Sequence, residues 1–88
     1  MFTVYAIASL NRNYIYIGLT SDLEKRLLRH NKGYEKTTKP YAPFELIYQE
    51  DFPNRQLARK QEVYLKSGIG REFLRKLRDS GAGLSTDR

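Results

Sequence analysis

The chain contains no cysteine, and this absence removes two classes of small protein at once. Without thiols the protein can hold neither a disulfide framework nor a zinc–thiolate site. It also lacks any apolar run near the roughly 20 residues that span a bilayer, and the segment from Met1 has no basic region of the kind that opens a signal peptide. From these absences we expect a soluble, cytoplasmic protein with no membrane partner.

The length of the chain limits its organisation. With 88 residues there is room for one domain with a modest core. We expect this domain to occupy residues 1–80, and we expect the small-residue segment 81–88 to form a flexible C-terminal tail. No internal repeat and no long linker divides the sequence, and a monomer is the expected state.

Positive charge is in excess, with 16 Lys and Arg residues against 10 Asp and Glu residues and a formal net charge of +6. From Arg55 to Arg78 there are eight basic residues and only two acidic ones. Such a stretch attracts nucleic-acid phosphates without sequence preference, although an ordinary solvated helix face can have the same composition. The charge therefore indicates an anionic partner without naming it.

Two segments near the start of the chain have the composition of β-strands. Residues 2–8 and 14–18 are rich in aromatic and β-branched residues, and a polar segment, 11–13, separates them. We therefore predict a hairpin. If its turn has an even number of residues, one face is apolar and the other carries Thr3, Tyr5, Ile7, Tyr14, Tyr16 and Gly18. The hairpin then places Tyr5 and Tyr16 side by side.

A helix is predicted over residues 22–31, directly after the hairpin. Ser21 and Glu24 have the spacing of a capping box, and Gly33 is typical of a C-terminal cap. Arg26 and His30 are four positions apart, so they lie on one flank of the apolar stripe of this helix. We expect both to point across the sheet.

The second half of the chain predicts one more strand and two helices. Pro40 and Pro43 bracket an extended entry into a strand over residues 44–48. Asn54 can cap the next helix, which we expect to end at Ser67-Gly68, and a short helix is predicted over residues 71–78.

Glu62 is predicted to lie on the inward side of the helix that Asn54 caps. Its neighbours on that side are apolar, and a buried carboxylate is costly unless it is paired, for which Arg59 and Lys66 are available. Hairpin parity and helical spacing together bring Tyr5, Tyr16, Arg26, His30 and Glu62 toward a common side.

The order and spacing of these residues resemble the GIY-YIG nuclease family, in particular its small stand-alone members. The resemblance covers residues 4–77 and rests on Tyr5, Tyr16-Ile17-Gly18, Arg26, His30 and Glu62, although the first signature reads Thr-Val-Tyr here. It implies an α/β chain of the α+β type, with a three-stranded antiparallel sheet flanked by helices in the order β-β-α-β-α-α.

The resemblance also implies a metal-dependent endonuclease that hydrolyses DNA phosphodiester bonds in repair, recombination or processing, on branched, damaged or single-stranded forms. Tyr5 and Tyr16 would bind, orient or deprotonate the attacking water, and Arg26 would neutralise charge on the phosphate. His30 would position the phosphate or relay a proton. Glu62 would bind one divalent ion, Mg²⁺ or alternatively Mn²⁺, and the ion and Arg26 together would stabilise the transition state.

Six basic residues are predicted to contact the DNA: Arg29, Lys32, Arg55, Arg59, Lys66 and Arg71. Two positions depart from the family pattern, because Leu19 stands where some members have lysine and Leu74 where several have asparagine. Each site residue also has a structural interpretation, such as sheet packing for the tyrosines or a surface position for Arg26. A non-catalytic nucleic-acid-binding module therefore stays open as the alternative.

Overall fold

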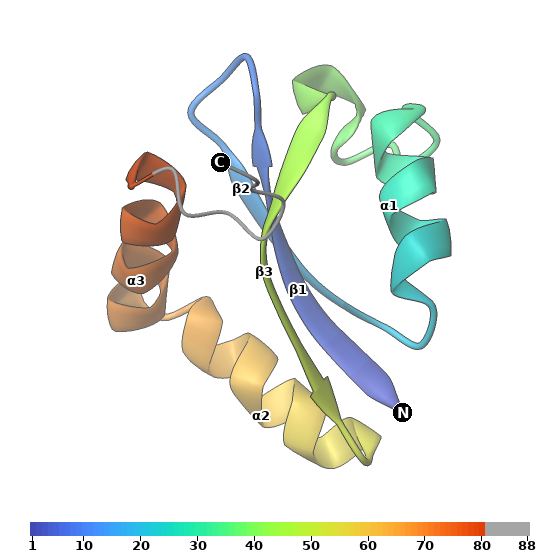
Figure 1. The fold of residues 1–88 in the computed structure, drawn as a ribbon, viewed down its shortest axis with the longest axis vertical. Helices are drawn as coiled ribbons and strands as arrows, with labels where there is room; N and C mark the ends of the chain where they lie inside the picture. The colour runs from blue at the N-terminus through green and yellow to red at the C-terminus, as the bar shows by residue number, and fades with distance from the viewer. Residues whose placement is uncertain (81–88) are drawn as a thin grey trace.

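The computed structural model describes residues 1–80; residues 81–88, where we predicted a flexible tail, lie outside the described part. Its centre is a three-stranded antiparallel sheet in the order β2-β1-β3 (Figure 1). The strands are β1 (Phe2–Ser9), β2 (Ile15–Thr20) and β3 (Phe44–Phe52). The α-helices are α1 (Leu23–Asn31), α2 (Arg55–Leu65) and α3 (Gly68–Asp79). This is the predicted β-β-α-β-α-α order, and no helix of the described residues is long and apolar enough to cross a membrane.

Alternation along β1 and β2 separates the two faces of the sheet as predicted. One face carries the buried side chains of Val4, Ala6 and Ile17, which pack with residues of α2 and α3. The opposite face carries Tyr5 and Ile7, and side chains of α1 pack against them. The sheet therefore lies between α1 on one side and α2 with α3 on the other, as Figure 1 shows.

The two ends of α1 differ in how well they were predicted. The side chain of Asp22 accepts a hydrogen bond from the Lys25 N–H at 3.2 Å, so Asp22 is the N-cap and the capping box predicted from Ser21 is wrong. Asp caps a helix as well as Ser does. At the other end Gly33 has a φ of 76°, and the Tyr34 N–H donates to the Arg29 carbonyl at 2.9 Å. This geometry favours glycine and confirms the cap.

Three boundaries in the second half differ from the prediction. β3 continues to Phe52, beyond the predicted end at residue 48, because its last residues pair with the start of β1 although their side chains are largely exposed. α3 begins at Gly68 rather than residue 71, since the Ser67 hydroxyl accepts from the Gly70 N–H and caps the helix. The extended entry expected before β3 is wrong over Lys39–Tyr41, which form one turn of 3₁₀ helix.

Candidate active site

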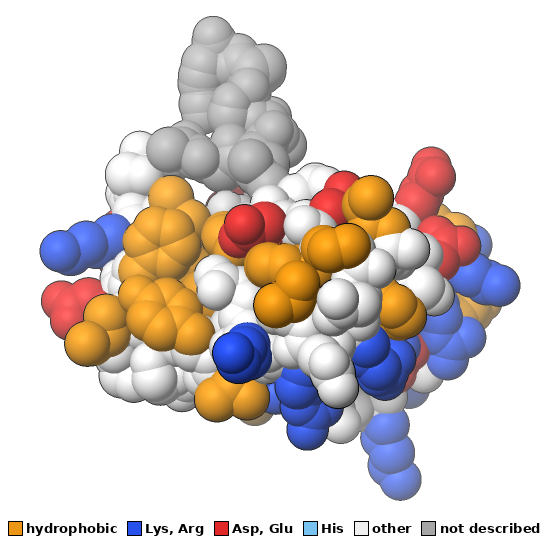
Figure 2. All heavy atoms as spheres, turned by 90° about the horizontal axis from the view of Figure 1, so that it is seen from below, with side chains coloured by type: hydrophobic (Ala, Val, Ile, Leu, Met, Phe, Trp, Pro, Cys, Tyr) orange, Lys and Arg blue, Asp and Glu red, His pale blue; other side chains and the backbone are white. Residues whose placement is uncertain are grey.

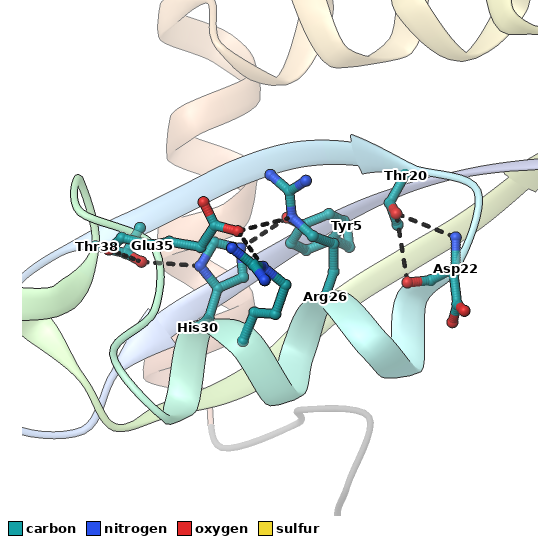
Figure 3. A network of polar contacts seen from close by, with 8 residues as sticks. Tyr5, Thr20, Asp22, Arg26, His30, Glu35 and Thr38 are labelled. Carbon is teal, nitrogen blue, oxygen red and sulfur yellow. Dashed lines mark hydrogen bonds and ion pairs between the residues drawn. The ribbon is translucent and has the colours of Figure 1, made fainter.

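Four of the predicted catalytic side chains converge on the face of the sheet that α1 covers. Tyr5 comes from β1 and Tyr16 from β2, and their ring centroids are 6.2 Å apart. Arg26 and His30 point from α1 toward Tyr5 (Figure 3), and the His30 ring lies 4.9 Å from that of Tyr16. The strand pairing brings the tyrosines together, because Tyr16 is opposite Ile7, which is on the same face as Tyr5.

A chain of hydrogen bonds fixes His30. The Tyr5 hydroxyl lies 2.8 Å from His30 Nε2, and His30 Nδ1 lies 2.8 Å from the Thr38 hydroxyl. Tyr5 is fully buried, and a buried hydroxyl needs an acceptor for its proton. Arg26 offers only donors, so the Tyr5 hydroxyl must donate to Nε2 of His30. A neutral His30 then carries its proton on Nδ1 and donates it to Thr38, whose hydroxyl in turn donates to the Glu35 carbonyl at 3.4 Å.

Burial keeps both members of the Tyr5–His30 pair neutral at pH 7. It raises the pKa of Tyr5 to about 12, even though the positive charge of Arg26 acts in the opposite direction. The pKa of His30 lies below its ordinary value, first because the ring is buried and second because the Arg26 charge disfavours a second cation nearby. Arg26 is therefore the cation of this cluster, and His30 is not.

Gly18 lets the Tyr5 side chain occupy its place. A Cβ atom on Gly18 would lie 2.5 Å from the Tyr5 hydroxyl oxygen and 2.6 Å from the ring carbon that carries it. Gly18, the last residue of Tyr16-Ile17-Gly18, therefore has no side chain because the Tyr5 ring packs directly against its backbone. Close packing of this kind is a usual reason for glycine inside a strand. Gly18 was predicted to lie on the tyrosine face, but its contact with Tyr5 was not predicted, although a glycine within a predicted strand is the available signal.

Glu35 lies beside Arg26 and was not predicted from the sequence. Its carboxylate accepts a hydrogen bond from Arg29 Nε at 2.8 Å and is 3.8 Å from Arg26 Nε. The hydrogen bond from Arg29 lowers the pKa of Glu35. Arg26 Nε is itself buried and has no hydrogen-bond partner. Nothing in the local sequence around Glu35 and Thr38 indicates their contacts, because both follow the end of α1 in a loop.

Glu62 does not join these four residues. It lies on α2, which covers the opposite face of the sheet, and no hydrogen bond or ion pair within residues 1–80 links it to them. A common site for Glu62 and these four residues stays a prediction: round the β2 edge, Lys66, whose Nζ lies 3.2 Å from Glu62 Oε2, lines the same cavity as Tyr16. The Glu62 side chain is 12% exposed and forms the ion pairs anticipated from the sequence, with Lys66 at 3.2 Å and Arg59 at 3.7 Å. Its Oε1 atom is buried and accepts no hydrogen bond.

The Glu62 Oε1 atom, which accepts no hydrogen bond and has Arg59 Nη1 at 3.7 Å, fits one kind of metal site. Mg²⁺ keeps several waters and commonly takes one carboxylate together with substrate phosphate. In the part of the chain that the structure describes, no group of three or more histidine, aspartate or glutamate side chains could enclose an ion. Glu62 therefore fits as the single protein ligand of a hydrated ion shared with substrate, and a site built wholly from protein ligands does not fit.

The six basic residues predicted to contact DNA fall into two groups. Four lie apart on α1 and α2 or directly after α1: Arg29, bonded to Glu35; Lys32; Arg55, over the Phe2 ring; and Arg59, paired with Glu62. Lys66 and Arg71 instead line a cavity of about 380 Å³ beside β2 and α3, which we call the β2–α3 groove, and Tyr16 lines it too. Leu74, at the position where the family resemblance implies asparagine in several members, is fully buried in the core and can play no polar role.

A three-stranded antiparallel sheet with helices on both faces, and a tyrosine–histidine–arginine cluster under one of them, defines a small α+β domain with a candidate active site. The chain belongs to the family of the GIY-YIG catalytic domain, whose model matches residues 1–73.

Relatives of the chain carry the name UPF0213. One from Staphylococcus epidermidis is 31% identical over 74 residues, which are 83% of this chain and 90% of that protein. Those from Staphylococcus saprophyticus and Bacillus pumilus are 41% and 43% identical over 54 residues each, or 60% of this chain. The matches cover 66% and 55% of these two proteins, so the chain spans two thirds of their length or less. No solved structure matches the chain.

Proposed function

We propose that this protein is a metal-dependent endonuclease that hydrolyses phosphodiester bonds of DNA. One observation carries the proposal: among residues 1–80, the buried side-chain polar atoms without a hydrogen-bond partner are Arg26 Nε and Glu62 Oε1. Leaving a buried polar atom unpaired costs about 1–3 kcal/mol, so such atoms are rare in folded proteins. Each of the two atoms has only a longer ion pair, Arg26 Nε with Glu35 at 3.8 Å and Glu62 Oε1 with Arg59 at 3.7 Å. A donor suited to phosphate and an acceptor suited to a cation therefore lack a hydrogen bond on the arginine and the glutamate that the family resemblance singles out.

Burial divides the cluster into residues that can meet a substrate and residues that cannot. Arg26 has a side chain that is 34% exposed, and Tyr16 is half-buried. Tyr5 and His30 are 0% and 1% exposed, so in this conformation neither can touch a phosphate or the attacking water. We therefore assign substrate contact to Tyr16 and Arg26. Tyr5 and His30 are positioning residues that act through Arg26 and Tyr16, in place of the direct roles that the resemblance implies for them.

The reaction in this proposal is the attack of a water oxygen on phosphorus. The bond from phosphorus to one bridging oxygen breaks, and that oxygen leaves with a proton as a hydroxyl end. The Tyr16 hydroxyl orients the water, and the Arg26 guanidinium neutralises the charge that develops on the phosphate oxygens. A divalent ion at Glu62 would supply Lewis-acid polarisation of a phosphate oxygen when bound. Neutral His30 matters here because a second cation beside Arg26 would repel its guanidinium.

The decisive experiment measures DNA cleavage in the presence of Mg²⁺ or Mn²⁺ on supercoiled, branched and single-stranded substrates. Wild type is compared with Tyr16→Phe, Arg26→Ala and Glu62→Ala. Glu72→Ala is the matched control, because Glu72 is an exposed carboxylate on α3 with no place in the site. We expect cleavage by wild type and the control, and a loss of at least about 100-fold in the three site variants, the scale of removing one transition-state contact.

Two outcomes would contradict the proposal. If wild type cuts none of the three substrates but binds them with an affinity that falls as salt rises, the protein is a binding module with the fold of a nuclease. If Glu62→Ala cuts as well as Glu72→Ala does, the metal assignment fails even though the nuclease activity stands.

A further inference from the structure

The β2–α3 groove is strongly basic. Four of its lining residues are cations, namely Lys66, Arg71, Arg75 and Arg78, and none of the lining residues is acidic. Asn13 from the hairpin turn and Tyr16 from β2 form the opposite wall. A concave surface lined by charge of one sign attracts and retains ligands of the other sign, so the groove favours an anion.

The arginines of the groove form a row. Arg71, Arg75 and Arg78 follow one another at spacings of four and three residues, which places them on one face of α3. At a rise of about 1.5 Å per residue, the row is about 10 Å long. A row of this length exceeds what a single phosphate can contact, and it suits a ligand that carries several phosphates in sequence.

The arginines of the groove differ in how firmly hydrogen bonds hold them in place. Arg71 Nε donates to the Lys66 carbonyl at 3.2 Å, and Arg78 donates to Asn13 at 2.7 Å and to Asp79 at 2.8 Å. These bonds hold two of the guanidiniums in place, and each retains further N–H groups. No hydrogen bond or ion pair within residues 1–80 engages Arg75, which is exposed. Lys66, the fourth cation, is paired with Glu62 at 3.2 Å. Among the described residues the groove therefore combines two fixed guanidiniums and one paired lysine with one arginine that has no such partner.

The groove also adjoins the candidate active site. Within residues 1–80, β2 pairs with β1 alone and is an edge strand, so its outer edge faces the groove. Tyr16 belongs both to the cluster around Arg26 and to the wall of the groove. We propose that the β2–α3 groove binds the backbone phosphates of the nucleic-acid strand next to the phosphate that is cleaved. This inference rests on the proposed function and adds Arg75 and Arg78 to the predicted contacts.

A second basic hollow does not have these properties. It is a depression at the start of α2 rather than a space between elements, because its lining is confined to Asn54, Arg55, Gln56, Leu57, Arg59 and Lys60. Figure 2 shows the surface that faces downward in Figure 1, where α2 lies. Across its middle, single Lys and Arg side chains stand between hydrophobic and uncharged atoms. The three cations of the hollow, Arg55, Arg59 and Lys60, all come from the start of one helix, so no second element forms an opposite wall for a phosphate backbone.

The test measures binding of a fluorescein-labelled oligonucleotide in EDTA, which prevents metal-dependent cleavage, at several salt concentrations. The double variant Arg71→Gln/Arg75→Gln is compared with Lys60→Gln/Lys76→Gln, which removes the same charge from exposed positions of α2 and α3 outside the groove. We expect the groove variant to lose about tenfold or more in affinity and its salt slope to fall by about 1.4–1.8, the value for two phosphate contacts. The control should stay within about threefold of wild type. Thermal unfolding of both variants checks that they are folded.

The outcomes separate this inference from the proposed function. If wild type binds and cuts DNA but both double variants lose affinity equally, binding is spread over the surface and the groove is not the site. If wild type neither binds nor cuts DNA, both the proposed function and the assignment of the groove as a phosphate-binding site are wrong. A competition arm uses a nucleoside triphosphate and a poly-glutamate peptide at charge concentrations matched to the oligonucleotide. Equal competition by either one overturns recognition of a nucleic-acid backbone.

Discussion

The Tyr5 hydroxyl and the His30 Nε2 atom lie 2.8 Å apart inside the core that joins the sheet to α1. Tyr5 is in the central strand and His30 in the last turn of α1, so this hydrogen bond fixes the helix against the sheet at the point where Arg26 emerges. The bond is buried, and a second hydrogen bond joins His30 to Thr38. A change at Tyr5, His30 or Thr38 should therefore alter the position of the Arg26 side chain. Four predictions test this arrangement.

Gly18→Ala should destabilise the protein and displace the Tyr5 ring. The new Cβ would meet the Tyr5 oxygen at 2.5 Å in a packed core, and overpacking of this kind costs about 1–3 kcal/mol. Chemical denaturation measures the loss. Gly68→Ala is the control, since a Cβ there meets nothing within 4 Å and alanine favours the helix. Equal stability of Gly18→Ala and wild type would show that the ring can move aside at no cost.

Thr38→Val should cost about 1–3 kcal/mol of stability, because it keeps the shape of the side chain and leaves the His30 Nδ1–H without an acceptor in a buried site. Thr38→Ser, which retains the hydroxyl, should lose less. The ¹⁵N chemical shifts of the imidazole report the tautomer directly, and we expect the proton on Nδ1 in wild type. A proton on Nε2 would reverse the direction of the hydrogen-bond chain.

Stability should fall as the pH drops below about 6.5. The pKa of His30 in the folded protein lies below the ordinary value of 6.5, so below that pH the unfolded chain binds a proton that the folded chain does not. Unfolding is then favoured by at most about 1.4 kcal/mol per pH unit. His30 is the only histidine of the chain, so a pH dependence of stability near pH 6.5 can be assigned to this residue. Denaturation of wild type and His30→Gln between pH 5.5 and 7.5 should show this dependence in wild type alone, and an equal dependence in both would refute it.

Tyr5→Phe should mainly lower the stability of the protein, whereas Tyr16→Phe should mainly lower its activity. Removal of the buried Tyr5 hydroxyl leaves Nε2 of His30 without its donor, so we expect a loss of about 1–3 kcal/mol of stability. Tyr16 is half-buried, and its hydroxyl has the Arg26 side chain as a hydrogen-bond partner. Tyr16→Phe should therefore lose about 0.5–1.5 kcal/mol of stability, the ordinary value of one hydrogen bond, and lower kcat.

The pair of tyrosine variants is measured by denaturation and by single-turnover cleavage. A Tyr5→Phe variant with wild-type stability would mean that the hydroxyl does not support His30. A Tyr16→Phe variant with wild-type kcat would remove Tyr16 from the reaction and leave Arg26 as the substrate contact on this face.

Local periodicity determined much of the fold. The period of two along residues 2–8 and 14–18 separates Tyr5 and Tyr16 from the apolar face, and the spacing of four in Arg26 and His30 places them on one side of α1. These relations are local, because they depend only on the geometry of a strand or a helix. The end of β3 was missed for the same reason: its exposed residues have no apolar period, and only pairing with β1 holds them in the sheet.

Tertiary structure alone decided how the site is divided and supported. Which face of the sheet receives a helix depends on the path of the chain, so the spacing within α2 could not show that this helix, which carries Glu62, covers the face opposite Tyr5. Contacts between distant residues, such as His30 with Thr38, Arg26 with Glu35, and Gly18 with Tyr5, have no period. The sequence by itself determined which residue types could form the site, whereas packing determined which are buried as supports and which remain open to a substrate.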